Sequence, residues 1–307
     1  MTSFSALIIS EFLFLFKFDI LIQVMHKIVG IIGYPLGHSL SPAMHNAAYR
    51  QLGLDYEYVP FEVPPEDLRE ALKGMRALHV AGFNVTIPHK ETIVPMLDEV
   101  TKLARFIGAV NTVENQEGKL IGFNTDGPGF IESLKEDAAF DPKNKKVVVL
   151  GAGGASRAVS AMLAEVEVKS LTITDVAEEK AKGLVEYLGS SSKVPCHLIR
   201  IGSAEMKREI EEADLLVNTT PVGMHPKIKE SPLPGNIKLN KKTLVYDLVY
   251  NPSETELLKT AKKSGCKTCS GLGMLVRQGA IAFTVFTGEE PPVDTMWDAA
   301  RRALRQG

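Results

Sequence analysis

Hydrophobic runs that suit β-strands alternate with amphipathic runs of helical period along most of the chain. Strand-like runs lie at 27–33, 56–62, 80–87, 109–113, 120–123, 147–150, 170–175, 214–218 and 243–247. Helical runs lie at 42–52, 128–135, from the glycine-rich segment 151–156 to about 164, and at 177–188, 273–287 and 293–305. Alternating strands and helices are typical of βαβ units, so the pattern predicts an α/β protein built on parallel sheets.

Turn and cap signals support these elements. Ser41 is expected at the N-cap of the first helix, with Pro42 at its first position and Gly53 at its end. A polar stretch at 141–146 looks like a linker, and the apolar run 147–150 after it suits a strand buried on both faces. Because 307 residues is roughly twice an ordinary domain length of about 150, two domains are expected.

The first 24 residues stand apart from this pattern. The segment 4–24 is rich in Leu, Ile and Phe, but Glu11, Lys17 and Asp19 interrupt it. A charge at mid-bilayer costs about 2.5–3.5 kcal/mol, which argues against stable membrane insertion. We expect residues 1–24 to be an extension outside the fold and Met25 to be the natural start, with a peripheral membrane anchor as the alternative. The intact mass of the natural protein tests this.

Composition narrows the class of protein. With 35 Lys+Arg against 37 Asp+Glu, the net charge of −2 gives no electrostatic reason to expect nucleic acid as a partner. Three cysteines are too few for a disulfide framework, so a cytoplasmic protein is expected. The CxxC at 266–269 has no second ligand pair in the sequence, and no metal site is expected.

The segment after the 147–150 strand carries a dinucleotide-binding pattern. Gly151 allows a tight turn, Gly153 lets backbone approach a pyrophosphate, and a small residue such as Ser156 permits close packing of the following helix. The helix N-terminus adds unpaired N–H groups for the phosphates. Because similar turns also occur without ligands, a purely structural turn is the alternative.

Asp175 ends the next strand and bears on the choice of dinucleotide. A carboxylate there accepts hydrogen bonds from the ribose hydroxyls of NAD and repels the 2′-phosphate of NADP. The segment 174–177 contains no arginine to hold that phosphate, so the residues favour NAD. Asp175 also suits the N-cap of the helix after it, and the two roles are compatible.

Four polar segments follow strands in the first half of the chain, at 39–41, 84–90, 111–112 and 124–126. The carboxyl ends of strands form the ligand crevice in open α/β sheets, so these side chains are expected to converge on a small polyhydroxylated acid. Each has a structural alternative: Ser41 as a cap, Asn111 as a turn residue and Lys90 as a solvated lysine.

These segments also carry a family resemblance. The runs 37–42, 83–90, 108–112, 124–127, 151–155 and 271–279 resemble the shikimate dehydrogenase (shikimate/quinate dehydrogenase) family. The resemblance implies an α/β substrate-binding and catalytic domain of residues 25–125 plus 272–307, to which the C-terminal helices return. It implies a Rossmann-like NAD(P)-binding domain at 126–271. The implied reaction is the reversible NAD(P)H-linked reduction of 3-dehydroshikimate to shikimate, on the route to chorismate and aromatic amino acids.

The resemblance also implies roles for individual residues. Lys90 and Asp126 are the implied catalytic pair, and a lysine beside a carboxylate suits proton transfer to and from a carbinol oxygen. The implied substrate-binding residues are Ser39, Ser41, Asn84, Thr86, Asn111, Asp126, Tyr250 and Gln278. The implied dinucleotide-binding residues are Gly151, Ala152, Gly153, Gly154, Ala155, Leu248 and Gly271, to which the strand-end argument adds Asp175.

Cofactor and substrate range stay open at this point. The family resemblance implies NADP, whereas Asp175 favours NAD and an NAD-dependent quinate/shikimate dehydrogenase. Ser41, where a threonine would suit quinate, favours shikimate. An alternative of another class is a non-catalytic module that senses a dinucleotide or shikimate. The expected partner is a small-molecule substrate, with a homodimer as the candidate assembly.

Overall fold

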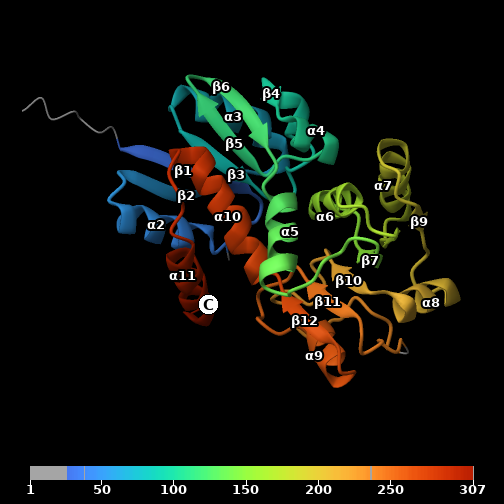
Figure 1. Cartoon of the computed structure of the whole chain (residues 1–307). Coiled ribbons are helices and arrows are strands. Elements are labelled where there is room, and N and C mark those ends of the chain that lie inside the picture. The colour runs from blue at the N-terminus through green and yellow to red at the C-terminus, as the bar shows by residue number, and fades with distance from the viewer. Residues whose placement is uncertain (1–25, 38, 236, 307) are drawn as a thin grey trace, which may run out of the picture.

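The computed structural model describes residues 26–37, 39–235 and 237–306, and within them the chain forms two six-stranded sheets (Figure 1). The first sheet has the strand order β2-β1-β3-β5-β6-β4. Its strands are β1 (Lys27–Gly33), β2 (Tyr56–Glu62), β3 (Gly82–Val85), β4 (Glu99–Val100), β5 (Thr112–Gln116) and β6 (Lys119–Phe123). β1 runs parallel to β2 and β3, and β5 pairs antiparallel to β3 and β6, so this sheet is mixed.

Helices cover both faces of the first sheet. On one face, Val29 and Ile31 of β1 pack with α2 (Ser41–Leu52), α10 (Leu272–Thr287) and α11 (Val293–Gln306). On the other, Ile32 packs with α3 (Leu68–Ala77). Short elements complete this half: η1 (Pro65–Asp67), η2 (Val94–Met96) and α4 (Lys102–Ile107). Both C-terminal helices therefore return to the sheet that begins the fold, as the sequence predicts.

The second sheet is wholly parallel, with the strand order β12-β11-β10-β7-β8-β9. Its strands are β7 (Lys146–Leu150), β8 (Ser170–Thr174), β9 (Cys196–Leu198), β10 (Leu215–Asn218), β11 (Leu244–Asp247) and β12 (Lys267–Ser270). Its helices are α6 (Gly154–Glu165), α7 (Glu178–Ser191), α8 (Ala204–Glu212) and α9 (Glu256–Lys263). Val149 packs on the α6 and α7 side and Val148 on the α8 and α9 side, because successive strand residues point to opposite faces.

One helix, α5 (Asp126–Glu136), joins the two halves and packs on both α10 and α6 (Figure 1). Its contact with α10 is close because glycines face it: a Cβ on Gly129 would lie 2.7 Å from the backbone nitrogen of Gln278. Arg277 of α10 adds a bidentate ion pair with Asp137, at 2.8 Å for the shorter bond. This packing places the N-terminus of α5 beside the middle of α10.

Several predicted boundaries differ from the structure. Ser41 is not the N-cap of α2: it is the first helical residue, Leu40 occupies the N-cap, and no side chain caps the helix. The hydroxyl of Ser39 instead accepts a hydrogen bond from the Ser41 N–H at 3.3 Å. The strand expected at 109–113 lies at 112–116, because its register is set by pairing with β3 and β6 rather than by its own apolar run. Gly53 does end α2 in the left-handed conformation.

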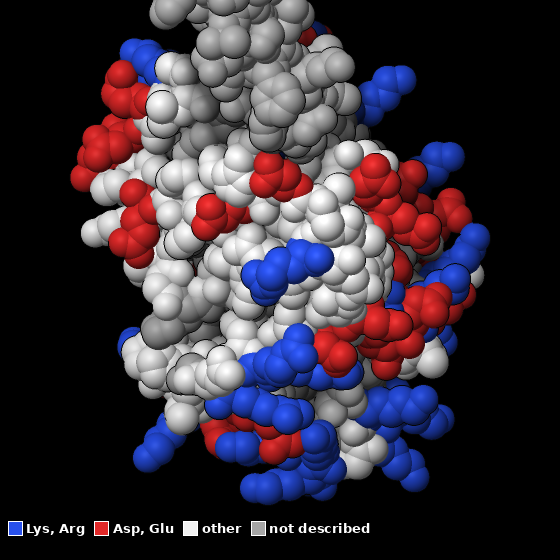
Figure 2. All heavy atoms as spheres, turned by 90° about the vertical axis from the view of Figure 1, so that its left-hand side faces the viewer, with Lys and Arg blue, Asp and Glu red and all other residues white. Residues whose placement is uncertain are grey.

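Charges of both signs share the face of the molecule shown in Figure 2, with basic side chains gathered toward the bottom of the view. Figure 1 places α9 at that end, where Lys259 and Lys262 form ion pairs with Glu256 and Glu254. In the part of the chain that the structure describes, no helix is long and apolar enough to span a membrane. The segment 1–24 lies outside the described residues.

Candidate active site

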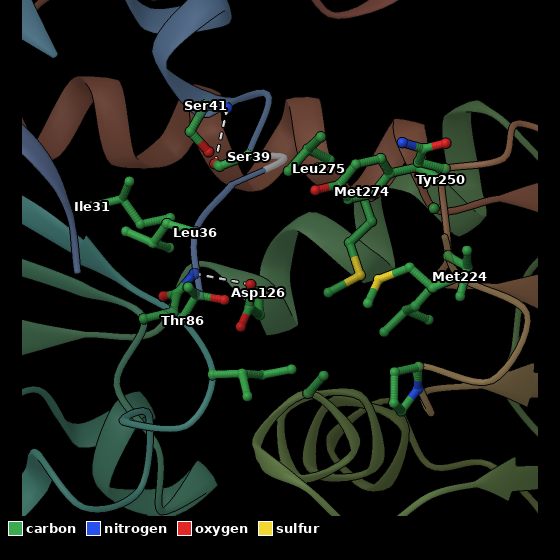
Figure 3. A pocket seen from close by; sticks show the side chains of 18 of the residues that line it. Ile31, Leu36, Ser39, Ser41, Thr86, Asp126, Met224, Tyr250, Met274 and Leu275 are labelled. Atoms are coloured by element: carbon green, nitrogen blue, oxygen red, sulfur yellow. Dashed lines mark hydrogen bonds between the residues drawn. The ribbon is translucent and has the colours of Figure 1, made fainter. Parts of the chain in front are cut away.

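A cleft of about 620 Å³ opens where the carboxyl ends of strands from both sheets face each other (Figure 3). The first half of the chain, α5, the second sheet and α10 all contribute to its lining. Twelve of the predicted site residues line it: Ser39, Ser41, Asn84, Thr86, Lys90, Asn111, Asp126, Ala155, Leu248, Tyr250, Gly271 and Gln278. Residues as far apart as 39 and 278 therefore meet in one cavity.

The predicted catalytic pair is formed. The ammonium of Lys90 lies 2.6 Å from Oδ2 of Asp126, and their side chains are only 15% and 6% exposed. Lys90 comes from the turn after β3, whereas Asp126 is the first residue of α5. The stem of Lys90 packs on the glycine-rich turn, since a Cβ on Gly154 would lie 3.1 Å from the Lys90 Cβ. The pair thus sits at the junction of the two halves.

Asn111 organises the groups around Asp126. Its amide nitrogen lies 2.9 Å from Oδ1 of Asp126, 2.8 Å from the Thr125 hydroxyl and 3.3 Å from Oε1 of Gln278. Its Oδ1 accepts a hydrogen bond from the Thr125 N–H at 2.7 Å. Because Asn111 holds one oxygen of Asp126, the other oxygen is left to Lys90, and the pair is fixed in orientation.

Tyr58, which the sequence reasoning missed, forms a hydrogen bond with Asn84. The hydroxyl of Tyr58 donates to Asn84 Oδ1 at 2.7 Å, and the Asn84 amide nitrogen donates to the Asn111 carbonyl and the Thr112 hydroxyl. Both amide hydrogens of Asn84 are therefore engaged within the protein. Tyr58 is buried, which raises its pKa, and it stacks on the buried ring of His45 at 4.4 Å. Inward-facing tyrosines on strands are common in cores, so the sequence carried no signal for this role.

Ser39 and Ser41 lie together at one end of the cleft (Figure 3). They sit at the N-terminus of α2, where the helix dipole favours an anion. Two hydroxyls at such a position suit a carboxylate. Met224, Met274 and Tyr250 lie across the cleft from these serines in this view.

The glycine-rich turn has the backbone that its pattern requires. Gly151 has a φ of +110°, and a Cβ there would lie 2.5 Å from the Thr219 hydroxyl oxygen. At Gly153 a Cβ would meet open space, as a surface approached by a ligand requires. Ser156 is buried and its hydroxyl donates to the Gly151 carbonyl at 2.6 Å, so the departure from Gly or Ala has a structural role. Of the turn residues 151–155, only Ala155 lines the cleft.

Asp175 lies outside the cleft lining and is engaged by backbone. Its two carboxylate oxygens accept from the N–H groups of Ala152 and Ala177, each at 2.7 Å. The first bond ties the glycine-rich turn to the end of β8. The second lies before α7, whose N-cap is Ala177, so Asp175 is not the N-cap. The neighbouring Val176 is 92% exposed.

His89, next to Lys90 in the chain, and the cysteines of the CxxC at 266–269 have structural roles. The ring of His89 is buried and its Nε2 lies 2.7 Å from the Val63 carbonyl. Burial raises the pKa of both Cys266 and Cys269, the latter to about 11, which leaves these thiols protonated and unreactive at neutral pH. Across the described residues, no group of three or more His, Cys, Asp or Glu side chains is placed to hold a metal.

Comparison with known proteins agrees with this geometry. Residues 31–113 match the model described as the shikimate dehydrogenase substrate binding domain, and 133–253 match shikimate / quinate 5-dehydrogenase. Residues 271–301 match the shikimate 5′-dehydrogenase C-terminal domain. The shikimate dehydrogenase (NADP(+)) of Methanopyrus kandleri is 49% identical over 279 residues, covering 91% of this chain and 96% of the relative. The chain belongs to the shikimate dehydrogenase family.

Solved structures of family members have the same fold. A shikimate 5-dehydrogenase from Listeria monocytogenes, in complex with shikimate and NAD, is similar with a TM-score of 0.82 and 40% identity, covering 89% of this chain and 95% of that one. A quinate dehydrogenase from Corynebacterium glutamicum, in complex with NAD, is similar with a TM-score of 0.80 and 34% identity, covering 89% and 98%. The family and the fold class predicted from the sequence are confirmed.

Proposed function

We propose that this chain is a shikimate dehydrogenase, which interconverts 3-dehydroshikimate and shikimate with a nicotinamide dinucleotide. The observation that carries the proposal is the buried Lys90–Asp126 pair, 2.6 Å apart in a cleft whose lysine stem packs on the glycine-rich turn. A sensor would need neither a proton-transfer group nor its carboxylate partner beside the dinucleotide turn. The pair therefore favours catalysis over the sensing alternative.

The chain's own residues suit the two halves of the reaction. The dinucleotide, when bound, supplies or accepts the hydride. Lys90 donates a proton to the carbonyl oxygen during reduction and takes the hydroxyl proton during oxidation. Asp126 orients the ammonium of Lys90 and accepts a hydrogen bond from a substrate hydroxyl. Such positioned acid–base groups contribute about 10²–10⁴-fold to a rate.

The remaining lining residues are assigned to binding. Ser39 and Ser41 hold the substrate carboxylate at the N-terminus of α2. The other substrate-binding residues are Asn84, Thr86, Asn111, Tyr250 and Gln278. The dinucleotide is held by 151–155 at the N-terminus of α6, by Leu248 and Gly271, and at its adenosine end by Asp175. The open space at Gly153 and the exposed α6 N-terminus fit a pyrophosphate.

Two observations bear on the choice between NAD and NADP, and they favour different cofactors. Relatives named for NADP(+) favour NADP, whereas Asp175 and the lack of Arg or Lys at 174–177 favour NAD. The similarity to a quinate dehydrogenase in complex with NAD makes an NAD-dependent quinate/shikimate dehydrogenase the second candidate function.

Initial rates test all of these assignments. Shikimate and quinate are each assayed with NAD⁺ and with NADP⁺, using Lys90→Ala as the catalytic control. Dominant turnover of shikimate with NADP⁺ supports the first candidate and refutes the ribose argument from Asp175. Dominant turnover of quinate with NAD⁺ supports the second. No turnover with any pair, together with measurable binding of shikimate, favours the sensor.

The domain boundaries and the cellular context are also proposals. Residues 25–125 plus 272–307 form the substrate-binding and catalytic domain, and 126–271 form the dinucleotide domain. Hydrogen exchange tests this, since the two sets should lose protection as separate groups. A cytoplasmic location and a homodimer are proposed, to be tested by cell fractionation and by light scattering.

A further inference from the structure

Two loops that line the cleft leave neighbouring strands at the same edge of the second sheet. The first loop, 219–226, follows β10, and the second, 248–251, follows β11. Ten residues of these two loops line the cleft, and Thr219 and Thr220 also lie beside the glycine-rich turn at Gly151. Because both loops form part of the cleft wall, its shape depends on their positions relative to one another.

Three buried polar side chains connect these loops. Asn218 ends β10, Asp247 ends β11, and Thr255 precedes α9, and all three are at most 1% exposed. The Asn218 amide donates to Asp247 Oδ1 at 2.8 Å, and the Thr255 hydroxyl donates to Asp247 Oδ2 at 2.6 Å. The carboxylate of Asp247 is thus the centre of a buried network.

Each end of the network holds one loop. Oδ1 of Asn218 accepts from the N–H and the hydroxyl of Thr220, at 3.0 and 2.7 Å, which fixes the start of the 219–226 loop. Oδ1 of Asp247 also accepts from the Val249 N–H at 3.1 Å, which fixes the 248–251 loop. Thr255 in turn accepts from the Leu258 N–H, so the network is anchored to the first turn of α9.

We propose that Asp247, with Asn218 and Thr255, is a positioning residue that sets the dinucleotide side of the cleft by locking the 219–226 and 248–251 loops together. The network contacts neither the catalytic pair nor the expected ligands, and it acts through the loops. The Asp247 carboxylate is buried with both oxygens accepting hydrogen bonds, so removing one donor leaves a buried acceptor unsatisfied and loosens the loop that it holds. The inference rests on the proposed function, since it assumes that the cleft binds a dinucleotide.

The close fit at the loop bases explains why small displacements matter. The Leu248 N–H donates to the Asn218 carbonyl at 2.9 Å, and Gly271 is so near that a Cβ on it would overlap the Leu248 carbonyl. A loop that moves by an ångström therefore changes the wall that faces the cofactor. Misplacement of this size costs up to about 100-fold in rate when it reaches the reacting groups.

The test compares two buried threonines, Thr243 directly before β11 and Thr255 directly before α9. Thr255→Val removes the hydroxyl that holds Asp247, whereas Thr243→Val removes a hydroxyl that donates to the Ala213 carbonyl at 2.7 Å, at the opposite end of the strand. Both hydroxyls are buried and each donates one hydrogen bond, but Thr255 also caps α9, so Thr255→Val should lower the melting temperature at least as much as Thr243→Val.

Only Thr255→Val should change the KM for the dinucleotide. We expect its KM for the dinucleotide to rise about tenfold and its KM for shikimate to change about twofold or less. Thr255→Ser keeps the hydroxyl, so both of its KM values should stay close to those of the wild type. Thr243→Val should keep both KM values. All three groups around the Asp247 carboxylate donate to it, so Asp247→Asn sets an amide NH2 against a donor. Asp247→Asn and Asp247→Leu should therefore both match or exceed the effect of Thr255→Val.

Two outcomes overturn this inference but leave the proposed function standing. In the first, Thr255→Val is active and its KM for the dinucleotide equals that of the wild type. In the second, the KM for the dinucleotide rises as much in Thr243→Val as in Thr255→Val. If the wild type shows no turnover, the proposed function fails, and dinucleotide affinity measured by fluorescence quenching compares the same variants. If the wild type binds no dinucleotide, both proposals fail.

Discussion

Replacing Lys90 with alanine separates its chemical role from its structural one. The change removes the only ammonium hydrogen-bonded to Asp126 among the described residues, from a carboxylate that is 6% exposed in the wild type. Breaking a fully buried ion pair costs about 3–5 kcal/mol, but Asp126 lines an open cleft and keeps its bond to the Asn111 amide. We therefore expect the free energy of unfolding to fall by about 1–3 kcal/mol, the range for one unsatisfied buried group.

The kinetic loss should be larger than the loss of stability implies. Without the proton donor, kcat should fall by about 10²–10⁴-fold while KM for shikimate changes much less. Urea unfolding gives the stability, and steady-state kinetics at a temperature where both proteins are folded gives kcat. Asp126→Asn is the matched variant, since it keeps the shape of the side chain and the lysine. Turnover of Lys90→Ala close to wild type would refute the assignment of Lys90 as the proton-transfer group.

Three further changes test other parts of the structure. Gly271→Ala would place a methyl group on the Leu248 carbonyl, so we expect about 1–3 kcal/mol of destabilisation in urea and weaker dinucleotide binding; an unchanged midpoint would contradict the packing. Tyr58→Phe leaves Asn84 Oδ1 without its donor, and we expect a loss of about 1–3 kcal/mol together with a raised KM for shikimate, whereas equal values in both proteins would remove Tyr58 from the site. Burial lowers the pKa of His45 to about 3, and both its ring nitrogens lack hydrogen-bond partners. Between that value and about 6.5 the unfolded chain binds a proton that the native protein does not, so acid should cost up to about 1.4 kcal/mol per pH unit. Unfolding curves at pH 7 and pH 5 should show a smaller acid loss for His45→Phe than for wild type, and equal losses would show that His45 is not the cause.

The elements that local rules govern were predicted well from the sequence. Among the described residues, the periods of 2 and 3.6 residues located nine of the twelve strands and the six longest of the ten α-helices, because side-chain alternation follows directly from backbone geometry. The short strands β4, β9 and β12 and the helices α3, α4, α8 and α9 were missed. The glycine-rich turn after β7 was predicted for the same reason, since Gly151 adopts a φ of +110° that other residues rarely reach. Ser41 shows the limit of such rules: a good N-cap residue stands one position inside its helix.

The polar segments at strand ends were also recognised, and the tertiary structure brought them together. Asn84 lies near the carboxyl end of β3, whereas Asn111 precedes β5, which runs antiparallel to β3, so the mixed pairing of the sheet brings the two residues together. That both amide hydrogens of Asn84 are used within the protein depends on Tyr58 from β2, which lies 26 residues away in the chain.

The sequence by itself determined the order of elements, the dinucleotide turn and the residue types available for proton transfer, because these depend on neighbours within a few positions. Only the tertiary structure decided which hydrogen-bond donors surround each polar side chain. Asp175 is engaged by two backbone N–H groups, and Asp247 is the centre of a buried network. Both are aspartates that end strands of the same sheet. They differ because each carboxylate takes its role from the donors around it: half-buried Asp175 accepts from Ala152 of the glycine-rich turn, and buried Asp247 accepts from the side chains of Asn218 and Thr255.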